Sequence, residues 1–199
     1  MNTRYLTLLC LLGAGCMVPG GSSPIVATKV IRATSSGTGC VYDAGTPEVT
    51  FGFFDAATGY MHALVLENRL LDNALKGPGR VNTNDFQVEY ATIDYEIVSG
   101  PAQTLPQQTT PANALIPTNA KGSTGLTLVP PGFIVAGTVV RLHIQVHGRL
   151  LDGTRVKTTT YEYVVAATTG QTQPTSCTGT QVAVYCENNG LQDTGFVCQ

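Results

Sequence analysis

The chain has 199 residues and a formal net charge of −2, and 12% of its residues are charged. It contains no run of lysine or arginine that would follow a phosphate backbone, so the composition argues against nucleic acid as a partner. It is rich in Thr, Val and Gly and poor in Lys and Glu, a bias typical of strands and turns rather than helices.

An export signal is predicted at residues 1–15. Arg4 precedes an apolar run over residues 6–12, and the small residues at 13–15 stand directly before Cys16. This order is typical of a secretory signal. The apolar run is shorter than the roughly 20 residues that a spanning helix needs. We therefore expect an exported chain whose signal is removed.

The segment before Cys16 resembles a bacterial lipobox, in which diacylglycerol is attached to the cysteine thiol and the chain is cut before it. Gly13 departs from the pattern, which usually has an aliphatic residue there. Several acyl chains on Cys16 would hold the protein on a membrane. Met17, in place of Asp, indicates the outer membrane in the enteric sorting pattern. The alternative is cleavage without lipidation.

Residues 16–24 are predicted to form a flexible tether of small residues. Strands are then predicted at Ile25–Ala33, Glu48–Phe54 and Met61–Leu71, and Asn68 interrupts the apolar pattern of the third.

A long strand is predicted next, over Asp85–Val98. Its apolar residues occupy even-numbered positions at 86, 88 and 90 and odd-numbered positions at 93, 95 and 97, so the apolar side of the strand changes midway. This slip of one residue predicts a β-bulge near Ala91-Thr92, or a strand that crosses between sheets. Residues 99–125 contain four prolines among Gln, Thr and Ala, and we interpret them as a long loop. Such a loop is either functional or mobile, and we favour mobility.

The clearest strand follows the predicted loop. Apolar residues at 140, 142, 144 and 146 alternate with polar residues at 141, 143, 145 and 147, which indicates one buried and one wet face. Asp152-Gly153 predicts a tight hairpin turn, with a return strand over Arg155–Val165.

Together these runs predict an all-β fold. We expect an immunoglobulin-like antiparallel β-sandwich over residues 25–170, followed by a cysteine-rich tail over residues 171–199. The chain has no tryptophan, so it lacks one hallmark of true immunoglobulin domains.

Four cysteines besides Cys16 follow the signal. In an oxidising compartment an even set of four predicts two disulfides with three possible pairings. We prefer Cys186 with Cys198 across a hairpin, and Cys40 with Cys177. Zinc is the competing interpretation, but the gaps lack the short spacing that a tetrahedral site usually has.

Four segments resemble, taken together, a group of short, uncharacterised lipoproteins of Gram-negative soil bacteria. They are Gly39-Cys40, Ala63–Leu71, Arg80–Asn84 and Val146–Gly153. The resemblance covers most of the mature chain and consists mainly of strand and turn patterns. It implies fold and location, and it carries over no activity and no binding residue.

No catalytic or metal-binding constellation is predicted. His143 and His147 share one strand face, but four residues of strand span about 13 Å, too far for both to hold one ion. His62 stands alone. No G-x-S-x-G elbow occurs, and the carboxylates show no acid and base pairing. Glu187 and Asp193 lack the spacing of a calcium loop. We expect no catalytic residue, metal or cofactor.

Four tyrosines carry the single ligand-binding hypothesis. Aromatic faces on a sheet surface would suit a glycan, although tyrosines on strands are also ordinary packing residues. The sequence therefore favours a non-enzymatic envelope lipoprotein with a structural or protein-interaction role. A surface glycan-binding module is the alternative, and a hydrolase ranks last. The tyrosines are Tyr90, Tyr95, Tyr161 and Tyr163.

Overall fold

The structure, a computed structural model, describes residues 23–35, 40–72, 82–170, 183–185 and 196–198. In this part of the chain there are thirteen strands and no helix, which confirms the all-β prediction. It accordingly contains no helix able to cross a membrane. The strands are β1 (Ile25–Ile31), β2 (Thr34–Ser35), β3 (Cys40–Val41), β4 (Gly52–Asp55), β5 (Tyr60–Asn68), β6 (Phe86–Ser99), β7 (Gln108–Ile116), β8 (Ala120–Val129), β9 (Val139–Leu150), β10 (Arg155–Lys157), β11 (Tyr161–Thr168), β12 (Ala183–Tyr185) and β13 (Phe196–Cys198).

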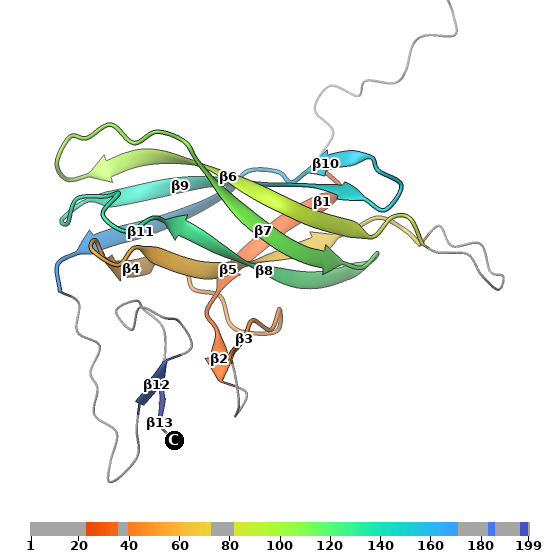
Figure 1. Cartoon of the computed structure of the whole chain (residues 1–199), viewed down its shortest axis with the longest axis horizontal. Helices are drawn as coiled ribbons and strands as arrows, with labels where there is room; N and C mark the ends of the chain where they lie inside the picture. The colour runs from red at the N-terminus through yellow and green to blue at the C-terminus, as the bar shows by residue number, and fades with distance from the viewer. Residues whose placement is uncertain (1–22, 36–39, 73–81, 171–182, 186–195, 199) are drawn as a thin grey trace, which may run out of the picture.

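Two main sheets make up the domain. One has the strand order β1-β5-β8, and the other has the order β4-β11-β9-β6-β7 with β10 paired to β9. Figure 1 shows the strands of both sheets running along the long axis of the domain, with β7 and β8 side by side. The small β2–β3 and β12–β13 pairs lie to one side of these sheets (Figure 1).

The two sheets share one hydrophobic core. The apolar residues of β9 alternate as predicted: Val140, Leu142, Ile144 and Val146 are fully buried, and the polar residues between them are partly exposed. Both sheets contribute to one continuous cluster, and its burial supplies the main stabilisation of the fold. Its largest members include Phe54, Tyr60, Leu64, Leu66, Phe86, Ile93, Ile116, Leu126 and Leu128.

The prediction of a loop over residues 99–125 is wrong. Most of this segment forms β7 and β8, which join the two sheets through a short turn. Pro111 lies within β7, and proline is tolerated there because β7 is the last strand of its sheet. The buried positions of β7 include Thr110 and Ile116, so its apolar alternation is weak and composition alone suggested a loop.

Asp85 holds the turn between β7 and β8. Its carboxylate accepts hydrogen bonds of 2.8 Å from both the backbone nitrogen and the hydroxyl of Thr118. Asn119 adopts a φ of 53°, a left-handed conformation that asparagine tolerates better than most residues. Polar side chains therefore stabilise this turn, and the proline content of the segment gave no indication of it.

The predicted β-bulge exists, but its position differs from the prediction. The register of β6 shifts between Val88 and Tyr90 against both neighbours. Against β9 the extra residue is Glu89, whereas against β7 the extra residue lies on β7. After the shift, Ala91 and Ile93 point into the core. Tyr90 therefore does not share the buried face of Phe86 and Val88, and it is 37% exposed. A second shift against β9 lies between residues 97 and 99.

The predicted hairpin at Asp152-Gly153 is confirmed. Gly153 has a φ of 90°, and its backbone nitrogen donates to the Leu150 carbonyl. The return strand is divided, because Thr158 separates β10 from β11 and its hydroxyl accepts a 3.0 Å hydrogen bond from Val146 N. The prediction of a purely antiparallel arrangement is wrong for this sheet, since β11 pairs with β4 in parallel.

The C-terminal pair β12–β13 is antiparallel, with Ala183 opposite Cys198. Cys177 and Cys186 lie outside the described residues, as do the side chains of Cys40 and Cys198. Both disulfide pairings therefore stay predictions, together with the signal and the anchor at Cys16, which also precede the described residues.

Candidate functional site

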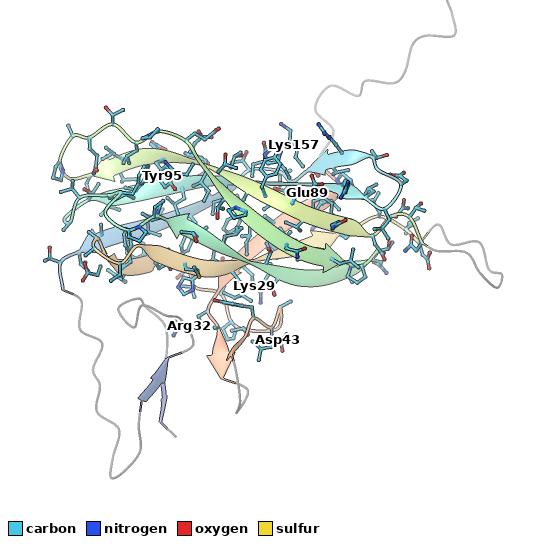
Figure 2. The ribbon with its side chains drawn as sticks, viewed as in Figure 1. Lys29, Arg32, Asp43, Glu89, Tyr95 and Lys157 are labelled. Atoms are coloured by element: carbon cyan, nitrogen blue, oxygen red, sulfur yellow. The ribbon has the colours of Figure 1, made fainter. Side chains whose placement is uncertain are left out.

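A cleft of about 360 Å³ opens beside the β6 bulge, between β6, β9 and β10. Its position follows from local structure, because the bulge turns Glu89 and Tyr90 outward where β9 continues into the β10 hairpin. Figure 2 shows Glu89 and Lys157 at this same end of the domain. The lining residues are Glu89, Tyr90, His147, Gly148, Arg155, Val156 and Lys157.

A stacked aromatic pair forms one wall of the cleft. The rings of Tyr90 and His147 lie 4.7 Å apart between centroids and are almost parallel, at 6°. The pairing register places these two residues opposite each other on β6 and β9. Because Tyr90 is 37% exposed, the pair offers an accessible flat surface for a ligand ring.

The His147 imidazole is held by its neighbours. Its Nε2 atom lies 3.1 Å from the Thr92 hydroxyl. Thr92 follows Tyr90 by two residues on β6 and so lies on the same face of the strand. Partial burial, and then the charge of Lys157, lower the pKa of His147 below its ordinary value. The ring is therefore neutral at neutral pH.

The pKa of His147 gives a testable prediction. An NMR titration of its ring protons should have a midpoint below the ordinary histidine value of about 6.5. Lys157→Gln should raise that midpoint only partway, because burial is the larger cause. Since the folded pKa is depressed, the contribution of His147 to stability is complete above about pH 6.5 and is lost as pH falls below it. A midpoint unaffected by Lys157→Gln would contradict this account.

The other wall of the cleft is polar and charged. The Glu89 carboxylate forms an ion pair with Arg149 at 3.2 Å. Arg155 and Lys157 lie on β10, which pairs with β9, and both are exposed. Gly148 lies between the walls, where the absence of a side chain leaves room for the Phe86 ring.

No protein-family model matches the chain. No curated protein matches it significantly either. The resemblance to short envelope lipoproteins stays a prediction from the sequence.

The four predicted tyrosines do not share one surface. Tyr163 is buried in the core, where its hydroxyl and that of Tyr60 form a 2.8 Å hydrogen bond. Tyr95 packs on Phe133 and donates a 2.8 Å hydrogen bond to the Leu128 carbonyl. Tyr90 alone of the four lines the cleft.

Tyr161 is half-buried at another place in the fold. Its hydroxyl donates a 3.1 Å hydrogen bond to Glu48. Burial, assisted by the nearby Glu48 carboxylate, raises the pKa of Tyr161 to about 12. This phenol therefore acts as a structural hydrogen-bond donor.

His143 and His147 have separate surroundings. His143 lies 3.2 Å from a Glu96 oxygen and 3.7 Å from a Glu162 oxygen on the outer face of the sheet, beside Arg141. These exposed pairs contribute little stability individually. His62 is fully buried and meets the Tyr60 ring edge-on at 4.6 Å. Within the described ranges, no three metal-ligating side chains converge.

Sequence reasoning selected Tyr90 but missed its partners in the cleft. Glu89 precedes Tyr90 in sequence, yet it lines a cleft only because the bulge falls on it. The alternation of β9 places His147 on its wet face, but the pairing of His147 with Tyr90 depends on the register between two residues 57 positions apart, which no local pattern encodes. The Asp-Gly turn was the one signal that placed β10 beside β9.

Proposed function

We propose that this chain is a non-enzymatic lipoprotein of the cell envelope whose β domain acts by binding a surface glycan at the cleft beside Tyr90. The observation that supports this is the stacked Tyr90–His147 pair, which offers a flat aromatic surface next to charged side chains. Sugar rings present C–H faces that pack on such surfaces and hydroxyl groups that bond to polar neighbours.

The cellular location in this proposal comes from the sequence. A lipid on Cys16 would hold the domain on the envelope. Met17, the residue after Cys16, favours the outer membrane. The architecture proposed with it is an immunoglobulin-like β-sandwich, with a C-terminal tail held by disulfides among Cys40, Cys177, Cys186 and Cys198.

A protein partner in the envelope is the broader form of the same binding role. The cleft favours a small ring ligand over a protein surface because its volume, about 360 Å³, matches a small-molecule site. A hydrolase is the weaker alternative. The Thr92 hydroxyl lies beside His147, but in the described part of the chain no carboxylate forms an ion pair with that imidazole, as an orienting residue of a triad would.

Replacing Tyr90 tests the proposal. We expect the full chain carrying Cys16→Ser to bind members of a glycan array, and Tyr90→Ala to weaken the best interaction about tenfold or more by isothermal calorimetry. Tyr90→Phe should retain most of the affinity, because the stacking ring is kept.

The matched control is Phe53→Ala. Phe53 is also an exposed aromatic residue, at 43%, but it lies on β4 and does not line the cleft. Its replacement should leave the affinity unchanged. Glycan binding that is indifferent to Tyr90→Ala would overturn the assignment of the cleft, and a protein without any glycan ligand would overturn the proposed function.

A further inference from the structure

Two cations line the cleft, and neither has a counter-ion among the described residues. Arg155 and Lys157 stand two residues apart on β10, so their side chains project from the same face of the strand. In the described part of the chain neither side chain forms an ion pair or a hydrogen bond, whereas the nearby Arg149 is paired with Glu89. The two cations are therefore available to a ligand.

The pairing register aligns one of these cations with the aromatic wall. Lys157 is opposite His147 on β9, and His147 is opposite Tyr90 on β6. The three residues thus form a row across three adjacent strands, with the ammonium group at its end. Lys157 is near enough to lower the pKa of His147. A ring stacked on Tyr90 would place its substituents toward this ammonium group.

The charge at the cleft is opposite to that of the whole chain. The formal net charge of the protein is −2, yet the lining carries Arg155 and Lys157 against one carboxylate, Glu89, which Arg149 already neutralises. Such a local excess of positive charge favours an anionic ligand.

A second cavity, of about 580 Å³, adjoins the cleft at β10. It shares Arg155, Val156 and Lys157 with the cleft. Its remaining lining is rich in hydroxyl and amide groups, which suit further sugar units: Ser23, Pro24, Gln145, Thr158, Thr159 and Thr160. Because the two cavities share these β10 residues, their combined volume leaves room for more than one ring.

We propose that the cleft takes an acidic oligosaccharide, in which one ring stacks on Tyr90 while its carboxylate lies between Arg155 and Lys157. This inference rests on the proposed glycan-binding function and specifies its ligand class. Paired cations bind a carboxylate through charge-assisted hydrogen bonds, which a neutral sugar does not form.

The test compares two probes that differ in charge. The full chain carrying Cys16→Ser is titrated with tetragalacturonate and with the neutral galactotetraose. We expect the acidic probe to bind about tenfold or more tightly than the neutral one. Raising the salt from 50 to 500 mM should weaken only the acidic probe, because salt screens exposed charges.

Charge-removing variants locate the effect. Arg155→Gln with Lys157→Gln should reduce affinity for tetragalacturonate about tenfold or more and leave galactotetraose unchanged. The control double variant, Arg32→Gln with Lys121→Gln, removes the same charge outside the cleft and should have no effect. The comparison of the two probes uses a chain in which Arg155 and Lys157 are intact, so it does not depend on the stability of the charge-removing variants.

Three outcomes would overturn the inference, and they differ in meaning. Equal binding of both probes, lost in Tyr90→Ala, would leave the glycan-binding function standing and remove its acidic specificity. Binding of neither probe, nor of any glycan on the array, would remove the proposed function as well. Binding to phosphatidylglycerol vesicles that needs Arg155 and Lys157, without binding of tetragalacturonate, would identify these cations as a contact with lipid headgroups.

Discussion

Gly148→Ala is expected to destabilise the domain by about 3 kcal/mol and to distort the cleft. A Cβ atom on Gly148 would overlap the backbone carbonyl oxygen of Gln87 and lie 2.8 Å from two carbons of the Phe86 ring. A backbone carbonyl in a paired strand cannot rotate away, and Phe86 is fully buried, so the strands must separate. Thermal unfolding should show a lower midpoint by roughly 6–12 °C.

Gly125→Ala is the matched control for Gly148. Gly125 also lies within a strand, β8, but a Cβ atom there would meet only a Tyr42 ring carbon at 4.0 Å, an ordinary contact. Its midpoint should stay the same or rise slightly, since alanine lowers the entropy of the unfolded chain. Equal effects of the two substitutions would show that β6 and β9 are not packed as closely as described.

Asn68→Ala should destabilise the domain by about 3 kcal/mol, because it leaves three buried or partly buried backbone groups without their side-chain partner. Asn68 is fully buried where β5 ends. Its amide donates to the carbonyl oxygens of Asn84, at 2.8 Å, and Ile116, at 3.2 Å, and its Oδ1 atom accepts a 3.1 Å hydrogen bond from Leu70 N. It thus joins β5, β7 and the segment before β6.

Urea unfolding of Asn68→Ala beside Asn113→Ala measures this contribution. Asn113 is exposed on β7, so its replacement should change the free energy of unfolding by no more than about 0.5 kcal/mol. A loss for Asn68→Ala as small as that of the control would mean that water replaces the lost amide, and that this junction is open to solvent.

The role of Asn68 illustrates how far sequence patterns carried the prediction. The residue interrupts an apolar run, and the sequence indicated only that interruption. The hydrogen-bond partners of its side chain lie in three segments, and the farthest partner is 48 positions from Asn68 in the chain. A polar residue at a strand end is read locally as a boundary, whereas its energetic role depends on which backbone groups the fold brings to it.

The prediction of a loop over residues 99–125 is wrong for a related reason. Strand prediction depends on apolar alternation, and β7 has little of it because it is the last strand of its sheet and contains Pro111. Its pairing with β6 and the Asp85 contacts that hold the turn to β8 are long-range. Composition could not report them.

The sequence by itself determined the strands whose two faces differ strongly in polarity, above all β9, the hairpin at Asp152-Gly153 and the existence of a bulge in β6. These are local properties, encoded by alternation of period two and by residues that accept particular backbone angles. Only the tertiary structure decided that the bulge falls on Glu89, that Tyr90 stacks on His147, and that Lys157 completes the row. The cleft is a product of register between strands distant in sequence, and a shift of one residue would move each of its side chains to the other face.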